Sequence, residues 1–417
     1  MPRPARESQH LFMRTKRDTC KVKHVLVLNQ FAIPRSQSGG TRHIDLFSNL
    51  DGWSPLIVAG NREHTSQDIY RTDDKRFKLA WVPTFTGAGL TRMAGWAVFA
   101  LQATAIGLTR RTVDVVYAST PQMLLPVAGA IVATLRRIPL IVEVRDLWPE
   151  SIIGAGALRR GSRTHRLLVG LERWIYKRAD QIVVVTPGWT EHFAGLGIDL
   201  HKIHVVSNGT DLDDFAVTDS RETLRSEFGL TGFTAVYAGA HGPANALDLV
   251  LDAAKALPSI NMLLVGAGSQ KARLQERAAA EGLANVEFRD PIPKTEMPRL
   301  LSACDVGVHS IEPLPVLAQG MSPNKLFDYM ASGLPAVSNA AVGLREVIVD
   351  GECGHLGGPE SLEFCLRQVY EATPEQRAMW GDRGREIVNE RFSRSAAAAT
   401  LRSVLQTTTT RGSRSST

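Results

Sequence analysis

A lysine and an aspartate lie three positions apart in the stretch "SPNKLFDYMASGLPAV", residues 322–337. Ser322 suits a helix N-cap, Pro323 the first helical position and Gly333 the C-terminal exit, so the stretch predicts a helix. The apolar face of this helix consists of Leu326, Phe327, Met330 and Ala331. Lys325 and Asp328 share the opposite face, where they can contact a ligand together.

The position of Lys325 is unfavourable for the helix unless an anion binds nearby. A cation in the first turn is opposed by the helix dipole by about 0.3–1 kcal/mol. Free backbone N–H groups and an ammonium together suit a phosphate, and Asp328, one turn deeper, suits the paired hydroxyls of a ribose. Asn324, Lys325 and Asp328 are therefore predicted to bind a nucleotide diphosphate; the alternative is a surface Lys–Asp pair without a ligand.

Small residues follow the first strand-like run in each half of the chain. Gly39 and Gly40 precede one expected helix, and His241, Gly242 and Asn245 precede another. Backbone N–H groups at such turns can approach a phosphate closely, so these five residues are also predicted ligand contacts. A Gly pair at such a place is also common in turns that bind nothing.

A second group of charged residues follows a buried run in "VEVRDLWPES", residues 142–151. Asp146 can accept a proton from an acceptor hydroxyl or hold a sugar hydroxyl, and Arg145 can steady a phosphate. Trp148 offers an apolar face to a sugar or lipid. Alternatively, Arg145 and Asp146 pair with each other and only shape the loop.

Other motifs are weaker or argue against particular chemistries. The acidic "DLDD" at 211–214 resembles a metal-binding DxD, but it follows "NG", where aspartates start turns and cap helices, so we expect no metal there. The "GAG" at 266–268 lacks the GxGxxG fingerprint that a nicotinamide-dependent dehydrogenase would need. No Ser/His/Asp or Cys/His arrangement is apparent, which argues against a hydrolase.

Short β-branched runs alternate with helical stretches and predict two parallel sheets covered by helices on both faces. The first set of runs is 24–29, 55–60, 78–82, 114–118, 139–144, 181–186 and 204–207, and the second is 233–239, 260–265, 285–289, 304–310 and 334–338. Ligands of such sheets bind beyond the carboxyl ends of the strands, so a cleft between the two domains is the predicted site.

The predicted boundaries follow from this pattern. They are a basic disordered leader (1–20), an N-terminal Rossmann-like domain (21–207), a linker with a short helix (208–229), a C-terminal nucleotide-binding domain (230–375), a helix that crosses back (376–406) and a disordered tail (407–417).

Composition narrows the class of protein. A chain of 417 residues with 44% apolar and 22% charged residues fits a globular protein of two domains. Four cysteines without pairing or metal spacing, and no visible signal peptide, predict a reducing, cytoplasmic location. The run 93–108 is too short and too polar to span a membrane. It is predicted to be a buried or half-buried domain helix, with docking on a membrane surface as the alternative.

Positive charge is concentrated at 159–166 and 172–178, within a net charge of +6. These residues form either a solvated helical face or a surface that contacts the anionic inner face of the cell membrane. Nucleic acid is not an expected partner, because no recognition motif accompanies the charge.

The chain resembles family 4 glycosyltransferases of the GT-B fold, and within them bacterial polysaccharide enzymes similar to fucosamine transferases. The segments that carry the resemblance are 142–151, 207–215, 237–248 and 323–335. It implies transfer of a sugar from a nucleotide donor to an acceptor, usually with retention of configuration and without a metal or other cofactor. It also implies that the donor binds in the C-terminal domain and the acceptor in the N-terminal domain.

The chain departs from this family pattern at two places. Many members carry two glutamates eight positions apart, and here Gly320 and Asp328 stand at those positions. Many also clamp the diphosphate with Arg and Lys after the first strand of the C-terminal domain, where this chain has Ala240 and Asn245. Lys325 and the backbone around His241 and Gly242 are expected to replace the missing cations.

The predicted function is transfer of a sugar, UDP-linked, to a glycan or lipid-linked acceptor in cell-surface polysaccharide biosynthesis, with Asp146 and Lys325 as the catalytic residues. Two alternatives remain at this point: a nucleotide-sugar epimerase of the same fold, and a nucleotide-binding scaffold protein without catalysis.

Overall fold

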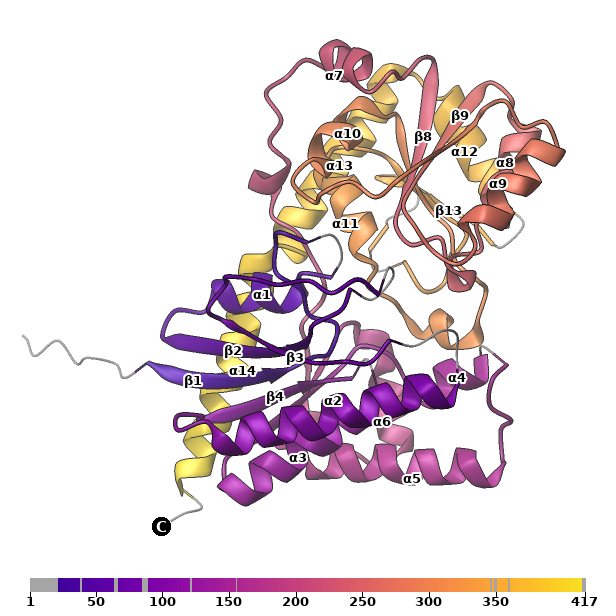
Figure 1. The fold of residues 1–417 in the computed structure, drawn as a ribbon. Coiled ribbons are helices and arrows are strands. Elements are labelled where there is room, and N and C mark those ends of the chain that lie inside the picture. The colour runs from indigo at the N-terminus through magenta and orange to yellow at the C-terminus, as the bar shows by residue number, and fades with distance from the viewer. Residues whose placement is uncertain are drawn as a thin grey trace, which may run out of the picture.

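The computed structural model describes residues 22–37, 40–63, 67–84, 89–120, 122–154, 156–345, 347–348, 351–358 and 361–414. The predicted leader 1–20 and Gly39 lie outside these residues. The chain forms two α/β domains, one above the other in Figure 1, and this confirms the predicted fold class.

The N-terminal domain contains a seven-stranded parallel sheet in the order β3-β2-β1-β4-β5-β6-β7. Its strands are β1 Lys23–Leu28, β2 Trp53–Gly60, β3 Phe77–Ala80, β4 Val115–Ser119, β5 Leu140–Val144, β6 Gln181–Val184 and β7 Ile203–Val205. β4, β5 and β6 are buried along their whole length, which explains their continuous apolar sequences.

Alternate residues of these strands point into two separate cores. One core lies under α2 (Leu90–Thr109), α3 (Leu124–Arg136), α5 (Arg163–Arg178) and α6 (Thr190–Gly195). The other lies under α1 (Arg42–Ser48) and the C-terminal helix α14 (Arg394–Arg414). The short helix α4 (Glu150–Gly154) follows the charged residues that end β5.

The C-terminal domain contains a six-stranded parallel sheet in the order β10-β9-β8-β11-β12-β13. Its strands are β8 Phe233–Ala238, β9 Ile260–Val265, β10 Val286–Arg289, β11 Val306–His309, β12 Ala336–Ser338 and β13 Gly354–Leu356. The last of these was not predicted, because "GHL" carries no strand pattern.

Helices also cover both faces of the second sheet. α7 (Arg221–Glu227), α10 (Met297–Ala303), α11 (Asn324–Ala331) and α13 (Pro374–Arg391) contribute to one core. α8 (Asp248–Ala256), α9 (Lys271–Ala280) and α12 (Leu362–Glu371) contribute to the other.

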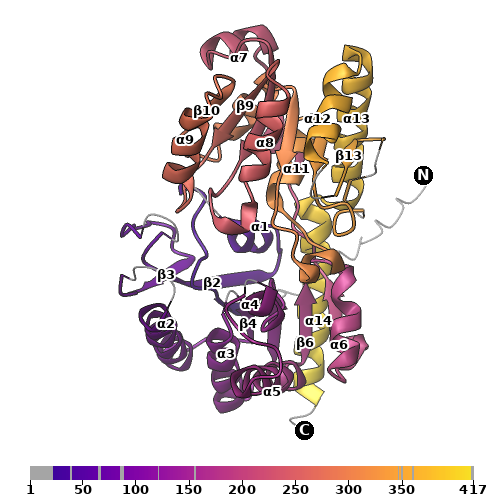
Figure 2. The ribbon, with the colours of Figure 1, turned by 90° about the vertical axis from the view of Figure 1, so that its right-hand side faces the viewer.

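The chain end crosses between the domains as two helices, so the prediction of one helix over 376–406 was wrong. The break lies at Phe392 and Ser393, where the chain passes from α13 on the C-terminal domain to α14 on the N-terminal domain (Figures 1 and 2). The predicted disordered tail was also wrong in part, because α14 continues to Arg414. The start of this predicted tail packs on the first sheet, since Thr408 is buried and the Thr409 hydroxyl accepts a hydrogen bond from Lys23 of β1 at 2.7 Å.

No helix in the described part of the chain is long and apolar enough to cross a membrane. α2, which contains the apolar run 93–108, covers the sheet of the N-terminal domain, as Figure 1 shows.

Candidate active site

α11 presents the lysine–aspartate pair that the sequence singled out. The helix begins at Asn324 with Pro323 as its N-cap, so the prediction of Ser322 as the cap was wrong. The Ser322 hydroxyl instead accepts a hydrogen bond from the backbone N–H of Asn208, at 3.0 Å. Gly333 ends the helix as predicted, with a φ of 75° that favours glycine.

Lys325 is a half-buried cation without a carboxylate partner among the described residues. Its Nζ donates to the Tyr237 hydroxyl at 2.8 Å and to the Asn245 side-chain oxygen at 3.3 Å. It also lies 4.0 Å from the centre of the Tyr237 ring. Burial lowers the pKa of Lys325 to about 7. Burying an ammonium is costly when its partners are neutral, so an anion that binds beside it is stabilised by the charge.

Glycine at position 239 makes room for this lysine. Gly239 has a φ of 155°, and a Cβ there would lie 2.9 Å from Lys325 Nζ. Tyr237 was not selected from the sequence, although its place at the end of the first strand of the domain was a usable signal. Its hydroxyl donates to the Ala240 carbonyl oxygen at 2.8 Å, which fixes the ring beside the lysine.

A cavity of about 480 Å³ opens beside Lys325 and Asp328. Asn245 and Asn324 also line it, and Glu63 comes to it from the N-terminal domain. Its apolar wall consists of Val265, Ile292, Met297 and Leu301. The size and the mixture of an apolar wall with few polar groups are typical of a site for a small molecule.

Asp328 is the second ionisable group of the helix inside this cavity. Burial raises the pKa of its carboxyl, while Lys294, Arg394 and a hydrogen bond from Thr210 oppose the change. Lys294, another residue that lines the cavity, was not selected from the sequence. Its signal was its place just after a strand, in "DPIPK".

The loop after β8 differs from the prediction in one respect. The His241 side chain is fully buried, between Tyr237 and Phe288, and the His241 N–H donates to the Ala267 carbonyl at 2.8 Å. This N–H is therefore not available to a phosphate. Desolvation, helped by Lys271 and Lys325, lowers the pKa of His241 to about 4, so the ring is neutral.

Other backbone donors of this loop remain available. Within the described residues, the N–H groups of Ala240 and Gly242 make no hydrogen bond, and Ala240 lines the cavity. Gly266 and Gly268 are needed for packing, because a Cβ on either would overlap backbone atoms of residues 239–241. This packing accounts for the "GAG" sequence without a ligand.

The first predicted phosphate turn lies at α1. Gly40 precedes this helix, and open space surrounds the position of a Cβ on it. The neighbouring Thr41 hydroxyl donates to Asp45 at 2.6 Å, and Lys294 of the other domain donates to the same hydroxyl at 3.3 Å. The turn therefore lies where the two domains meet.

Asp146 and Glu143 of the charged stretch have different environments. Asp146 is exposed, and its carboxylate makes no hydrogen bond among the described residues. Partial desolvation raises the pKa of Asp146, and Arg145 opposes that shift. No ion pair joins Arg145 to Asp146, so the structure does not favour the loop-shaping alternative. Glu143 is fully buried and was not among the selected residues.

The acidic "DLDD" segment binds an arginine in this structure. Arg394 pairs with Asp214, and its backbone N–H donates to Asp211 at 2.9 Å. Gly320, at the place of the first family glutamate, lies against the N-terminal domain; a Cβ there would lie 2.5 Å from the Thr186 hydroxyl. A glutamate does not fit this packing.

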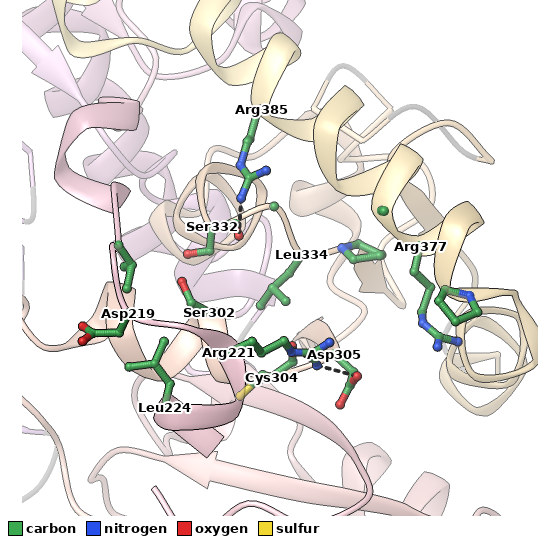
Figure 3. A pocket seen from close by; sticks show the side chains of 15 residues that line it. Asp219, Arg221, Leu224, Ser302, Cys304, Asp305, Ser332, Leu334, Arg377 and Arg385 are labelled. Atoms are coloured by element: carbon green, nitrogen blue, oxygen red, sulfur yellow. Dashed lines mark hydrogen bonds and ion pairs between the residues drawn. The ribbon is translucent and has the colours of Figure 1, made fainter. Parts of the chain in front are cut away.

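A second cavity, of about 360 Å³, lies away from α11 Lys325 on the C-terminal domain (Figure 3). Its arginines are already bonded to protein groups. Arg221 pairs with Asp305, Arg377 donates to the Ala372 carbonyl, and Arg385 donates to the Ser332 carbonyl. We therefore assign the functional site to the cavity beside Lys325.

Two family models match the chain, one for each domain. The glycosyl transferase 4-like domain matches residues 50–209, and the glycosyl transferases group 1 model matches residues 232–371. Together they cover most of the chain, which belongs to the family 4 glycosyltransferases of the GT-B fold. The narrower likeness to fucosamine transferases stays a prediction.

Curated relatives are similar over part of their length. A D-inositol 3-phosphate glycosyltransferase from Mycobacteroides abscessus is 29% identical over 209 residues, which are 48% of this chain and 46% of that protein. A 2-deoxystreptamine glucosyltransferase from Streptomyces kanamyceticus is 25% identical over 240 residues, 55% of this chain and 60% of that protein. The chain thus matches about half the length of these relatives.

Solved structures share the fold over nearly the whole chain. The Anabaena protein HepE in complex with UDP-glucose has a TM-score of 0.68 and 19% identity, covering 92% of this chain and 99% of that one. Sucrose-phosphate synthase from Thermosynechococcus elongatus has a TM-score of 0.72 and 17% identity, covering 92% and 98%.

Proposed function

We propose that this chain transfers a sugar from a UDP-sugar to a glycan or lipid-linked acceptor in cell-surface polysaccharide biosynthesis, with retention of configuration and without a metal. The observation that carries the proposal is Lys325, a half-buried cation that lines a cavity and has no carboxylate partner in the described part of the chain. The UDP and UDP-glucose complexes of the Anabaena HepE protein support the choice of nucleotide.

On the donor side, charge develops on the diphosphate as the sugar leaves. The Lys325 ammonium and the free N–H of Ala240 can stabilise that charge, because both lie beside the same cavity. Asp328 would hold the ribose hydroxyls, and the apolar wall would contact the base. Closure of the two domains would exclude water and so suppress hydrolysis.

On the acceptor side, Asp146 is the proposed group that accepts the proton or holds a sugar hydroxyl. Its raised pKa moves it toward the range in which a carboxylate is a useful base. Trp148 packs against Trp96 of α2, with ring centres 5.6 Å apart, and this fixes the loop that carries Asp146.

Calorimetry on two variants tests the donor site. Losing a hydrogen bond to a charged group costs about 1.5–3 kcal/mol, so Lys325→Met should weaken UDP binding roughly 10- to 150-fold and uridine binding little. Asp328→Asn should weaken UDP and uridine alike, because both carry the ribose. Wild-type UDP affinity in Lys325→Met would contradict the proposal.

Release of nucleotide distinguishes this proposal from the epimerase and the scaffold. UDP release that requires acceptor indicates a transferase, and release without acceptor indicates an epimerase or simple hydrolysis. Activity should survive excess EDTA, because Lys325 and backbone amides supply the charge at the diphosphate. A strict requirement for Mg²⁺ or Mn²⁺ would contradict this part of the proposal.

We further propose that α2, α3 and α5 rest on the inner face of the cell membrane. These helices cover the same face of the first sheet, and Figure 1 shows them side by side. Large apolar side chains on them are exposed: Leu101 by 72%, Leu135 by 66%, Leu167 by 71% and Trp174 by 46%. Exposed cations lie just before α5 and in its first turn, at Arg159, Arg160, Arg163 and Arg166. Apolar groups and cations together suit an anionic lipid surface.

Sedimentation with vesicles tests this surface. The protein should sediment with vesicles rich in phosphatidylglycerol at low salt, and it should be released as ionic strength rises. Changing Arg159, Arg160, Arg163 and Arg166 to Gln should reduce binding. Unchanged binding by that variant would show that the basic residues have another purpose.

A further inference from the structure

A buried polar cluster begins at the carboxyl end of the first sheet. The Glu143 carboxylate accepts from Arg42 Nε at 2.8 Å, from His43 Nε2 at 2.7 Å and from the Tyr117 hydroxyl at 2.9 Å. All four side chains are buried. Nδ1 of His43 lies 3.0 Å from the amide nitrogen of Asn29, so the neutral ring can carry its hydrogen on Nε2 and donate it to Glu143. The carboxylate is thus fixed by three donors.

Arg42 connects this cluster to the segment that leaves the domain. Its two terminal nitrogens donate to the Val206 carbonyl at 2.6 Å, the Ser207 carbonyl at 2.9 Å and the Asn208 side-chain oxygen at 2.9 Å. The planar guanidinium therefore holds β5 and the domain linker in one fixed arrangement.

Asn208 continues the connection to α11, which is called the donor helix below because it carries Lys325 and Asp328 of the proposed donor site. Because its side-chain oxygen accepts from Arg42, its Nδ2 is free to donate, and it does so to the Ser322 carbonyl. Its backbone N–H donates to the Ser322 hydroxyl at 3.0 Å. Ser322 lies two residues before α11, which carries Lys325 and Asp328.

The two chain segments that cross between the domains are fixed to each other beside Asn208. The Thr210 N–H donates to the Phe392 carbonyl at 3.0 Å, and a Cβ on Gly209 would lie 2.0 Å from the same oxygen. Arg394 donates to the Thr210 hydroxyl at 3.3 Å. The contact between Asn208 and Ser322 therefore lies beside the place where both chain segments cross between the domains.

We propose that Arg42 and Asn208 are positioning residues for sugar transfer, which hold the donor helix α11 in register with the acceptor domain. This inference rests on the proposed function. The cavity beside Lys325 is lined mostly by the C-terminal domain, so loss of the connection should leave donor binding intact and misplace the donor relative to the acceptor.

Kinetics and binding separate this role from general fold damage. Asn208→Ala should lower kcat roughly 10- to 100-fold, because small misplacements of reacting groups have effects of that size, while UDP affinity changes less than about threefold. Arg42→Lys keeps the positive charge beside Glu143 but cannot make all the hydrogen bonds of the guanidinium to residues 206–208. It should therefore have the same effect on kcat and UDP affinity as Asn208→Ala. The double variant should lose little more than either single variant, because both act through one path.

Conservative and control variants sharpen the result. Ser322→Thr keeps the hydroxyl acceptor and should retain the wild-type kcat, and Ser322→Ala should fall between it and Asn208→Ala. Arg402→Ala is the matched control. Arg402 also joins segments far apart in the chain, by donating to the Asn49 carbonyl at 3.1 Å, but its partners Asn49 and Asp51 both belong to the N-terminal domain. Equal losses of kcat and UDP affinity in Asn208→Ala would overturn the proposal.

A distance measurement tests the connection independently of the reaction. Spin labels at Glu191→Cys on α6 and Glu276→Cys on α9, with Cys20 replaced by Ser, should give a narrow interdomain distance distribution in the otherwise unchanged protein. Adding Asn208→Ala should broaden it, and adding Arg402→Ala should not. An unchanged distribution in an active protein would overturn this inference. If the protein turns over no nucleotide sugar, but Asn208→Ala still broadens the interdomain distance distribution, the proposed function is overturned and the connection is supported.

Discussion

Each domain holds a polar cluster at the carboxyl end of its parallel sheet, and the two clusters differ in how their charge is met. In the N-terminal domain, the Glu143 carboxylate is paired with Arg42 and also accepts from His43 and Tyr117. In the C-terminal domain, the hydrogen-bond partners of Lys325 among the described residues are the neutral oxygens of Tyr237 and Asn245.

The shifts in pKa follow the same division. Contacts with His43 and Arg42 hold the pKa of Glu143 well below its usual range, in spite of the desolvation that opposes them. Burial lowers the pKa of Lys325 to about 7. Removing one partner of a buried ion pair is costly, because the other charge is left buried and unpaired. A buried charge that has only neutral partners is typical of a functional site.

The largest effect should come from Asp146, which belongs to neither cluster. Asp146→Asn should lower turnover by roughly 100- to 10,000-fold, which is the usual contribution of a positioned base, while UDP affinity stays within about threefold. Steady-state kinetics and calorimetry measure the two quantities. Asp51→Asn, at a fully exposed position before β2, is the control. Equal losses in turnover and UDP affinity would show that the two substrates are assigned to the wrong domains.

Stability should separate the two clusters directly. Glu143→Gln breaks a buried ion pair and should lower the free energy of unfolding of the N-terminal domain by about 3–5 kcal/mol. Lys325→Met removes an unpaired charge and should raise the free energy of unfolding of its domain by about 0.5–2 kcal/mol. Urea denaturation followed by circular dichroism measures both. A similar loss in both variants would remove the distinction between the clusters.

The pH dependence of donor binding should come from Lys325. Bound diphosphate raises the pKa of the lysine, so binding takes up a proton above pH 7, and affinity for a UDP-sugar should fall by up to about tenfold per pH unit. Calorimetry from pH 6.5 to 9, in two buffers with different heats of ionisation, measures the affinity and the proton uptake. The slope should be absent in Lys325→Met.

The stability of the ligand-free protein should change in the opposite direction. The folded-state pKa of Lys325 is about 7 and its usual value is 10.5, so between these pH values the unfolded chain binds more protons. The contribution of this residue to stability therefore rises with pH over that window. The difference in unfolding free energy between wild type and Lys325→Met should shrink from pH 7 to pH 9, and a constant difference would contradict the pKa assignment.

The smallest expected effect is that of Tyr237→Phe. The variant removes the hydroxyl that accepts from Lys325 but keeps the ring 4.0 Å from the ammonium. Loss of one such hydrogen bond should weaken UDP binding roughly 3- to 10-fold, less than Lys325→Met does. Calorimetry with UDP measures this, and an effect as large as that of Lys325→Met would assign the phosphate contact to the hydroxyl instead.

The sequence alone predicted every strand of the two sheets except β13, within one or two residues at most ends. It also predicted the face of α11 that carries Lys325 and Asp328. Both predictions rest on local patterns: buried parallel strands require continuous apolar runs, and a helix places residues three apart on the same face. Gly333 ended the helix for an equally local reason, since its left-handed backbone suits glycine.

Tertiary structure decided which polar groups meet. Tyr237 and Lys325 are 88 positions apart, and Glu143 and Arg42 are 101 positions apart, so no local pattern links them. The same applies to Ser322, whose hydroxyl could cap α11 but instead accepts from Asn208, 114 positions earlier. It also applies to α14, whose last turns were predicted to be disordered and are held by the first sheet. Local propensities fix where elements form, whereas the pairing of buried charges depends on which strand ends the fold brings to the same edge.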